Sequence, residues 1–354
     1  MSDSKIKVGI TQGDINGIGY EIIFKALADN RLLDLFTPVI YGSSKVAAYH
    51  RKALNIANFS LNSIKTAEDA HPKRVNIINC LSDEVRVELG KSTTIAGDAA
   101  LKALELAVQD VKRGAIDVLV TAPINKKNIQ SDKFSFPGHT EYLARQAETD
   151  EVLMLMISDY LKVGVVTGHI PLKDVAENIT IDSIVEKLKI LDSTLRIDFT
   201  VRKPRIAVLG LNPHAGDQGV LGKEEEEIII PAIEKAKEAG IMAMGPYPAD
   251  GLFGNPQFKN FDAILAMYHD QGLAPFKALA FTNGVNYTAG LPFIRTSPDH
   301  GTAYDIAGQN KADKESFLNA LYLAVDAYKN RQENQKLAKN PLKNFDKNEL
   351  EYKE

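Results

Sequence analysis

Residues 161–169 read LKVGVVTGH, an apolar, β-branched run that ends in a histidine. The same arrangement recurs in RIAVLGLNPH at 205–214 and in DAILAMYH at 262–269. Each run is typical of a buried strand, so His169, His214 and His269 are expected just past strand ends. Ligands of open α/β sheets bind in the crevice outside the carboxyl ends of the strands. Three imidazoles at that edge would suit zinc or a neighbouring transition metal, which indicates an enzyme.

Short apolar runs and amphipathic segments alternate along the rest of the chain. Strands are expected over 7–11, 38–41, 75–79, 116–121, 152–157, 161–167, 205–211, 263–267 and 284–287. Helices are expected over 20–35, 45–55, 96–113, 141–148, 182–195, 224–239 and 315–335. This alternation predicts an α/β fold with a mostly parallel sheet covered by helices on both faces. The 354 residues leave room for two lobes.

The composition is that of an ordinary globular protein, with 44% hydrophobic residues and a formal net charge of −4. A nucleic-acid partner is not expected, because such proteins usually carry a basic face. Cys80 is the single cysteine, which excludes an internal disulfide and CxxC zinc sites. The polar N-terminus has no signal-peptide pattern, and no stretch reaches the roughly 18 apolar residues of a membrane span. We expect a cytoplasmic protein without a membrane partner.

Polar residues gather in the second half of the chain. Arg295 lies within LPFIRTS, an apolar and strand-like context in which an unpaired cation would be costly. A phosphate or carboxylate ligand would neutralise the Arg295 cation. The alternative is that Arg295 and Lys277 are ordinary surface charges. His139 and Thr140 begin an expected helix and could grip an oxyanion. His50 is expected to be a surface residue.

The glycine-rich segment Gly13–Gly19 lies between the first expected strand and the first expected helix. It is not a Rossmann fingerprint, since Ile22 stands where the third glycine would fall, and no GK[ST] follows to make a P-loop. A tight turn and an anion-binding loop are both consistent with it.

Several long motifs resemble one family. GD–GIG, PGHTE, VTGHIPL, LNPHAGDQG, MYHDQGL and VNYTAGLPFIRTSPDHGTAYDIAG occur in order between about Val8 and Arg331. Together they resemble the 4-hydroxythreonine-4-phosphate dehydrogenase family of pyridoxal phosphate biosynthesis. Two positions depart from the family pattern: Ile15-Asn16 replaces Pro-Ala in the first loop, and Asn125-Lys126 replaces a His-Lys pair after VTAP.

The resemblance implies a two-lobed α/β/α fold like that of isocitrate and isopropylmalate dehydrogenases, with the active site in the cleft between the lobes. The first lobe would comprise residues 1–135 and 296–354, including a cofactor loop at 299–310 and a charged C-terminal tail. Residues 136–295 would form the second lobe, with the metal and substrate residues and the dimer contacts. The active site would lie at the interface of a homodimer.

The resemblance also assigns ligands. It implies that His169, His214 and His269 bind a divalent metal, zinc foremost and cobalt or magnesium as alternatives, in a site completed across the dimer interface. Substrate-binding residues would be His139, Thr140, Lys277, Asn286 and Arg295. The stretch from His300 to Gly308 resembles the adenosine-binding loop of the wider superfamily, with His300, Gly301 and Asp305 at the cofactor. NAD is expected rather than NADP, since Asp305 would repel a 2′-phosphate.

The implied reaction is metal-dependent, NAD(P)-linked oxidation of 4-phosphooxy-L-threonine at C3, with decarboxylation to 3-amino-2-oxopropyl phosphate. A related enzyme acting on another phosphorylated hydroxy acid, such as 4-phospho-D-threonate or 4-phospho-D-erythronate, is the alternative. A phosphate acyltransferase or a non-catalytic metal-binding protein is a more distant one. Asp250, Asp270 and Lys277 are candidates for the general base. Asp250 could equally be a turn residue before Gly251.

Overall fold

The computed structural model describes residues 5–82, 84–280 and 283–339. Its strands are β1 Lys7–Thr11, β2 Thr37–Gly42, β3 Asn62–Ile64, β4 Asn76–Asn79, β5 Val118–Thr121, β6 Leu153–Ile157, β7 Lys162–Thr167, β8 Arg205–Leu209, β9 Met242–Tyr247, β10 Ala263–Tyr268, β11 Val285–Ala289 and β12 Ile294–Pro298. Its α-helices are α1 Gly19–Leu27, α2 Leu32–Leu35, α3 Ser44–Ala53, α4 Thr94–Lys112, α5 His139–Gln146, α6 Val175–Asn178, α7 Ile181–Ile197, α8 Ile230–Glu238, α9 Ala249–Phe253, α10 His269–Leu279 and α11 Glu315–Ala338.

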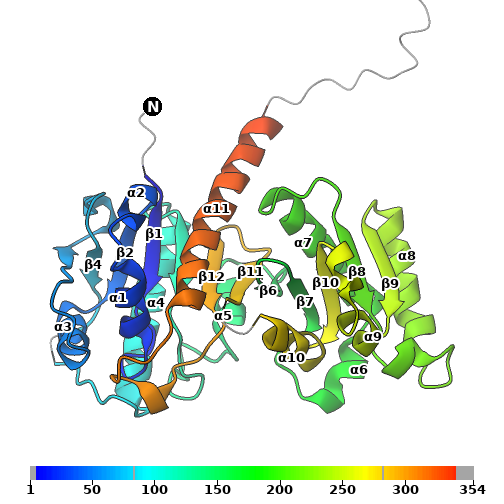
Figure 1. The fold of residues 1–354 in the computed structure, drawn as a ribbon, viewed down its shortest axis with the longest axis horizontal. Helices are drawn as coiled ribbons and strands as arrows, with labels where there is room; N and C mark the ends of the chain where they lie inside the picture. Colours follow the sequence, from blue (N-terminus) through cyan, green and yellow to red (C-terminus); the bar gives the residue numbers. More distant parts are fainter. Residues whose placement is uncertain (1–4, 83, 281–282, 340–354) are drawn as a thin grey trace, which may run out of the picture.

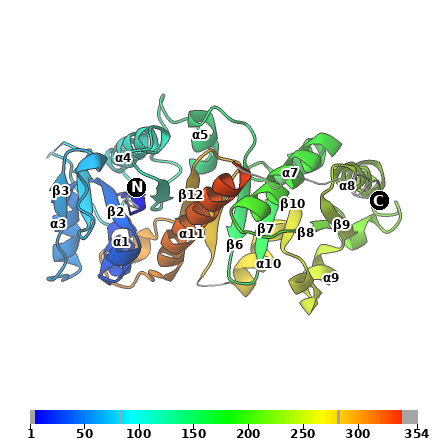
Figure 2. The same cartoon turned by 90° about the horizontal axis from the view of Figure 1, so that it is seen from above.

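Within the described ranges, the strands form one twelve-stranded sheet in the order β3-β4-β2-β1-β5-β12-β11-β6-β7-β10-β8-β9. Most neighbours pair in parallel, while β12–β11, β11–β6 and β6–β7 pair antiparallel. Helices cover both faces of the sheet (Figures 1 and 2). The predicted α/β class with a mostly parallel sheet is therefore confirmed.

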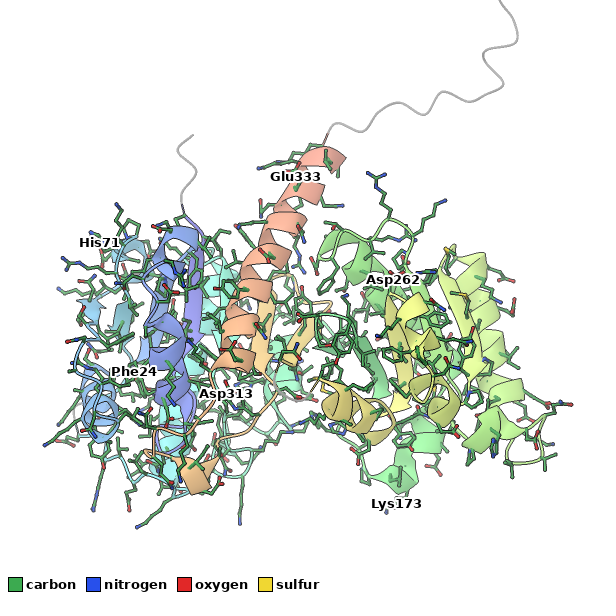
Figure 3. All side chains as sticks on the ribbon, in the orientation of Figure 1. Phe24, His71, Lys173, Asp262, Asp313 and Glu333 are labelled. Atoms are coloured by element: carbon green, nitrogen blue, oxygen red, sulfur yellow. The ribbon has the colours of Figure 1, made fainter. Side chains whose placement is uncertain are left out.

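The antiparallel strands lie in the middle of the molecule and join two parallel halves (Figure 1). A division into lobes at 135/136 and 295/296 stays a prediction, and β12 runs across the second of these boundaries. Figure 3 shows Asp262, just before β10, at one edge of the second half and Lys173, after β7, at the opposite edge. The carboxyl ends of β7 and β10 therefore face the same edge, as the sequence analysis expects for the histidine-bearing loops.

The sheet is buried on both faces, which explains its nearly continuous apolar strands. One apolar cluster joins β1 to helices α1 and α11, and a second joins β5 to α4 and α5. A third packs α9 and α10 against β7 and β10. These clusters fix α5, α10 and β12, the elements that carry most of the polar residues considered below.

Helix α10, strand β9 and the environment of His50 differ from the sequence-based expectations. Helix α10 was not expected because Gly272 and Pro275 lie inside it, and β9 because it contains a Gly-Pro pair. The prediction of a surface position for His50 was wrong: its exposed fraction is 1% and its Nε2 lies 2.7 Å from the carbonyl oxygen of Ile15. Burial lowers the pKa of His50 to about 4. This imidazole stands on the same face of α3 as Val46 and Ala47, so it belongs to the core.

No helix in the described ranges is both long and apolar enough to cross a membrane. The expected charged tail falls largely on residues 340–354, which lie outside the described residues.

Candidate active site

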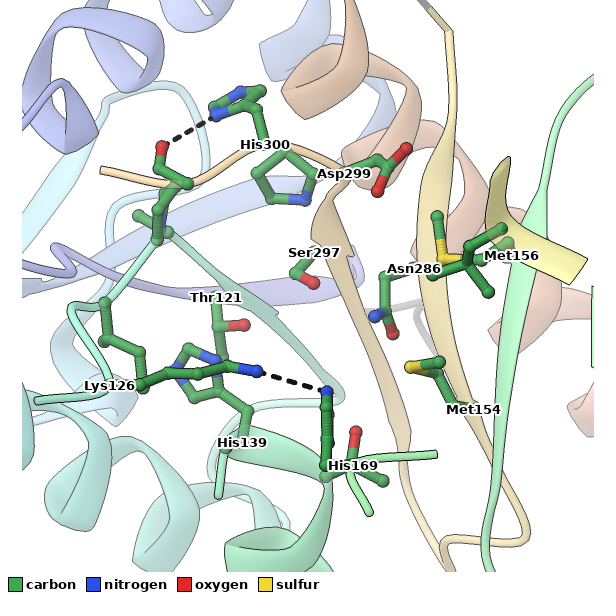
Figure 4. Close-up of a pocket in the computed structure, with 18 of the residues that line it drawn as sticks. Thr121, Lys126, His139, Met154, Met156, His169, Asn286, Ser297, Asp299 and His300 are labelled. Atoms are coloured by element: carbon green, nitrogen blue, oxygen red, sulfur yellow. Dashed lines mark hydrogen bonds between the residues drawn. The ribbon is translucent and has the colours of Figure 1, made fainter. Parts of the chain in front are cut away.

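A cavity of about 270 Å³ opens where the two halves of the sheet meet (Figure 4). Strands β5 and β12 of one half and β6 and β11 of the other contribute to its walls, together with α5 and α10. Its lining includes Thr121, Lys126, His139, Thr140, Met154, Met156, His169, His269, Lys277, Asn286, Arg295, Ser297, Asp299, His300 and Gly301. All five residues predicted to bind substrate therefore line one cavity.

Arg295 is the most deeply buried cation in this lining. The residue is 2% exposed, and its guanidinium donates to Thr121 Oγ1 at 2.6 Å and Thr288 Oγ1 at 3.1 Å. No carboxylate among the described residues lies in ion-pair contact with it, and its Nε has no hydrogen-bond partner there. Burial lowers the pKa of Arg295 to about 9, although the more distant Glu141 charge opposes the shift. A buried cation that only neutral oxygens contact is suited to an anionic ligand.

The first two residues of α5 face this guanidinium. Gly138 is the N-cap of the helix, and His139 and Thr140 follow it at the start of α5, where backbone N–H groups have no intrahelical acceptor. The Nε2 atom of His139 is buried and has no partner among the described residues. Burial, reinforced by the Arg295 and Lys126 charges, holds the pKa of His139 well below its usual range. His139 is therefore neutral at pH 7 and can offer one ring nitrogen as a donor.

Lys277, near the end of α10, is another cation that lines the cavity. Its Nζ is 3.1 Å from Asp299 Oδ1, while about half of its side chain is exposed. Asn286 on β11 faces Arg295, with its Oδ1 at 3.4 Å from Nη1. Arg295, Asn286 and Lys277 thus all line this cavity, with Arg295 buried and Lys277 about half exposed.

His169, two residues beyond β7, has both ring nitrogens engaged. Its Nδ1 donates to Glu141 Oε1 at 2.9 Å, and Lys126 Nζ donates to its Nε2 at 3.1 Å (Figure 4). Burial raises the pKa of Glu141, but the hydrogen bonds from His169 and from the backbone, together with the His169 and Lys126 charges, outweigh burial, and the net pKa lies below the ordinary value. The carboxylate therefore fixes the tautomer in which Nε2 carries the lone pair, and in the structure that lone pair accepts from the Lys126 ammonium, whose place a metal ion would take.

His269 has the same arrangement at the start of α10. Its Nδ1 donates to Asp270 Oδ1 at 2.6 Å, which again leaves Nε2 as the ligating nitrogen. The ring centroids of His169 and His269 are 5.9 Å apart. Metal-bound histidines almost always donate their second ring nitrogen to a carboxylate, carbonyl or water, so the chemistry of this pair fits a divalent metal.

His214 does not line the cavity. It lies in an exposed loop after β8, and no group of three metal-ligating side chains occurs in the described part of this single chain. His214 and Ala215 have left-handed backbone conformations, with φ of 54° and 51°. Such strain clusters at functional sites. Gln271 links the segment after β8 to the end of β10. Its Nε2 donates to Gly210 O, and its Oε1 accepts from Met267 N.

A second cavity of about 280 Å³ adjoins the first. It is lined by Ile18, Gly284, Asp299, His300, Ala303, Ile306, Ala312, Asp313 and Ser316. Asp299 and His300 line both cavities. His300 Nε2 is buried without a partner in the described ranges, and burial lowers the pKa of this imidazole. Asp305 is exposed in the short 3-10 helix beside the second cavity, and Gly301 lines the first.

The glycine-rich loop at 13–19 is buried and contacts the segment 302–304 beside the second cavity. Ile18 N donates to Thr302 O at 3.1 Å, and Tyr304 OH donates to Asp14 Oδ2 at 2.7 Å. A Cβ added to Gly17 would lie 2.7 Å from Thr302 O, which explains the glycine. These contacts favour a tight structural turn over an anion-binding loop.

Of the three candidates for the general base, one lines the cavity. Lys277 lines the cavity, whereas Asp250 lies in α9 outside the lining. Asp270 is 84% exposed and is engaged by His269. The structure thus brings Lys277 together with the other four predicted substrate residues, and leaves Asp250 outside the lining.

The lining residues that the sequence did not indicate as site residues include Thr121, Lys126 and Asp299. Thr121 is the last residue of β5 and Lys126 lies in the loop that follows, so the two stand at or just past a strand end, as the histidines do. A polar residue just past a buried strand was the available signal. Asp299 precedes His300 in the expected cofactor loop and gives no separate signal in sequence.

The fold and the cavity define an α/β enzyme whose site takes a small anionic substrate. Residues 34–324 match the family described as "Pyridoxal phosphate biosynthetic protein PdxA". The chain belongs to this family.

Named relatives agree with this assignment. A Bacteroides thetaiotaomicron protein named 4-hydroxythreonine-4-phosphate dehydrogenase is 56% identical over 97% of this chain and 94% of its own. The crystal structure of the Klebsiella pneumoniae protein of that name superposes with a TM-score of 0.80 at 37% identity, covering 92% of this chain and 100% of its own. An Oceanobacillus iheyensis protein named "Putative D-threonate 4-phosphate dehydrogenase" is 39% identical over 90% of this chain and 97% of its own.

Proposed function

We propose that this protein oxidises 4-phosphooxy-L-threonine at C3 with NAD(P) and that loss of CO2 then gives 3-amino-2-oxopropyl phosphate. The observation that carries the proposal is the buried Arg295 at the end of a cavity that also holds Lys277, His139 and Thr140. The names of the relatives point to the same substrate.

The chain's own residues bind and orient the substrate. Arg295 offers two nitrogens to a phosphate or carboxylate oxygen, and the free N–H groups at the start of α5 face the same anion. Lys277, the half-exposed cation of the lining, would neutralise the second anionic group, so the molecule would reach from Arg295 to Lys277. This orientation would present its C3 hydroxyl to the ring nitrogens of His169 and His269.

The metal and the cofactor belong to the proposal. His169 and His269 would hold a divalent ion, zinc foremost and cobalt or magnesium as alternatives, and the neighbouring cavity at 299–313 would hold NAD(P). When bound, the ion supplies Lewis-acid polarisation of the C3 oxygen, and the nicotinamide supplies the two-electron acceptor.

His214 would complete the metal site from a second copy of the chain. It is exposed on a loop with a left-handed backbone conformation and does not line the cavity of its own chain. Exposed apolar side chains lie on the nearby loops, with Leu172 71% and Val220 77% exposed. A homodimer that buries these loops would explain both features.

A substrate comparison tests the proposal. The purified protein is incubated with NAD and each of 4-phosphooxy-L-threonine, 4-phospho-D-threonate and 4-phospho-D-erythronate, with and without zinc, cobalt or magnesium. We expect NADH formation to be fastest with 4-phosphooxy-L-threonine and to stop when a chelator removes the metal. Faster turnover of 4-phospho-D-threonate would favour the second candidate function, which the Oceanobacillus relative supports.

Glu141→Gln is expected to weaken zinc binding by about 10- to 100-fold, since a neutral amide no longer raises the basicity of His169 or fixes its tautomer. The measurement is a competition titration with a chromophoric chelator. Glu148→Gln, at an 88% exposed position beyond α5, is the matched control. Unchanged zinc affinity in Glu141→Gln would show that this carboxylate does not support a metal ligand.

The protein is expected to prefer NAD over NADP, because the Asp305 carboxylate would repel a 2′-phosphate. Asp305→Asn should reduce this preference by about tenfold, the effect of losing roughly 1.4 kcal/mol of repulsion. Steady-state kinetics with both cofactors provide the measurement. If the wild type prefers NADP, or if the variant keeps its selectivity, Asp305 only shapes the local turn.

A further inference from the structure

The loop beside the second cavity adopts backbone conformations that need support from outside the loop. Residues 303–312 include a short 3-10 helix, Tyr304–Ile306, followed by turns. The φ angles of Ala303, Gly308 and Asn310 are 44°, 75° and 57°, all in the left-handed region. That region is costly for alanine, and such a conformation persists where the surrounding structure holds it. The contacts of this loop with the rest of the chain therefore decide the shape of the cavity wall.

Two charged side chains of α1 hold the end of this loop. Lys25 Nζ donates to the carbonyl oxygens of Asn310 at 3.0 Å and of Ala312 at 2.8 Å. Glu21 Oε1 accepts from the backbone N–H of Ala312 at 2.7 Å. The two side chains also form an ion pair, with Lys25 Nζ 2.8 Å from Glu21 Oε1. The pair thus binds both backbone polar groups of Ala312, a residue that lines the second cavity.

This pair differs from an ordinary ion pair on a helix surface. Exposed pairs four residues apart contribute little, because water screens them. Here the Glu21 side chain is 1% exposed and that of Lys25 is 25% exposed. All three hydrogens of the Lys25 ammonium have an acceptor, two of them in the loop. A buried carboxylate and a fully engaged ammonium are costly to separate, so the contact with the loop is a strong one.

Helix α1 gives the pair a fixed position relative to the cavity. Its residues Ile22, Ile23 and Phe24 are buried in the apolar core. Ile18, the N-cap of the same helix, lines the second cavity. The core therefore fixes one wall of this cavity at Ile18, and the Glu21–Lys25 pair fixes the facing loop at Ala312.

We propose that Glu21 and Lys25 are positioning residues for the cofactor, which hold the backbone at 310–312 in the conformation that receives the adenosine end of NAD(P). This inference rests on the proposed function, which assigns NAD(P) to the second cavity. Neither side chain lines that cavity, so both act through the loop. When only a fraction of the molecules has the competent conformation, the apparent Kd rises by the inverse of that fraction. Loss of the pair should thus weaken cofactor binding and leave turnover at saturating cofactor unchanged.

The test compares Lys25→Met with the wild-type protein, because methionine keeps the length of the side chain and removes the ammonium. Calorimetry without metal or substrate gives Kd values for NAD and for ADP-ribose, which carries the adenosine end alone. We expect both Kd values to rise about tenfold, as they would if about one-tenth of the molecules kept the competent loop. In steady-state kinetics, KM for NAD should rise by the same factor, while kcat and the Kd for 4-phosphooxy-L-threonine stay unchanged. Lys102→Met, at an exposed position of α4 outside both cavities, is the matched control.

A second variant separates positioning from stability. Lys25→Met alone leaves the buried Glu21 carboxylate without its cation, and Glu21 Oε2 has no hydrogen-bond partner among the described residues. The double variant Glu21→Gln/Lys25→Met removes this uncompensated charge and keeps an acceptor for the N–H of Ala312. Its unfolding temperature should return toward that of the wild type. Its Kd for ADP-ribose should stay about tenfold higher, because the carbonyls of Asn310 and Ala312 still lack their donor.

Wild-type Kd values for NAD and ADP-ribose in Lys25→Met would overturn the inference. So would a double variant that regains cofactor affinity together with stability, or a loss that appears in kcat instead of KM. Failure of the proposed function has separate signatures. A wild type that binds neither NAD nor ADP-ribose contradicts the cofactor assignment and the inference with it. A wild type that binds both but does not oxidise 4-phosphooxy-L-threonine contradicts the reaction alone, and the Kd values still decide the role of the pair.

Discussion

Arg295→Lys should lower kcat/KM for the phosphorylated substrate by about 100-fold. Lysine keeps the positive charge but has a single ammonium group, so the bidentate contact with an oxyanion is lost. Each hydrogen bond to a charged group contributes about 1.5–3 kcal/mol, and 1.4 kcal/mol corresponds to a factor of ten. The shorter reach would also leave Thr121 Oγ1 and Thr288 Oγ1 without their donor. Steady-state kinetics and a Kd for substrate without cofactor provide the measurement.

The affinity for NAD should not change in this variant, because Arg295 does not line the second cavity. Arg205→Lys, at the exposed start of β8, is the matched control and should keep wild-type kinetics. If Arg295→Lys retained the substrate Kd of the wild type, this cavity would not be the anion site.

His169→Ala should abolish most activity, by about 1,000-fold, and lower the bound divalent metal to well below one per chain. A catalytic metal site usually has three protein ligands, and the loss of one opens the site to water and weakens its hold on the ion. Metal content by mass spectrometry after dialysis reports the binding directly. Circular dichroism should remain that of the wild type, because His169 lies in a loop beyond β7 and outside the core.

His71→Ala is the matched control, since His71 is exposed and far from the cavity lining. Normal turnover together with normal metal content in His169→Ala would show that His169 is not a ligand.

The parts of the fold that could be predicted are those with local signals. Strand ends before His169 and His269 were visible because β-branched runs are buried on both faces of a parallel sheet. The burial of Arg295 followed from its apolar neighbours in LPFIRTS, and the structure confirms it. The convergence of the substrate residues came from the family resemblance, since the sequence alone does not place β11 beside β12 and β6.

The parts that could not be predicted depend on contacts between distant segments. Helix α10 forms in spite of Gly272 and Pro275 because Leu273 and Phe276 pack into the core of the second half. His50 is buried because the carbonyl of Ile15 lies next to its ring. The contact of Lys126 with His169 and the ion pair of Lys277 with Asp299 arise only when segments from both halves meet.

The central claim is that this cavity converts 4-phosphooxy-L-threonine, and product analysis tests it most directly. The wild-type protein is incubated with that compound, NAD and zinc, and the mixture is followed by phosphorus NMR with parallel measurement of NADH and CO2. The account predicts equal amounts of NADH, CO2 and 3-amino-2-oxopropyl phosphate. An unchanged substrate in the presence of metal, while a phosphorylated hydroxy acid without an amino group is oxidised under the same conditions, would contradict it.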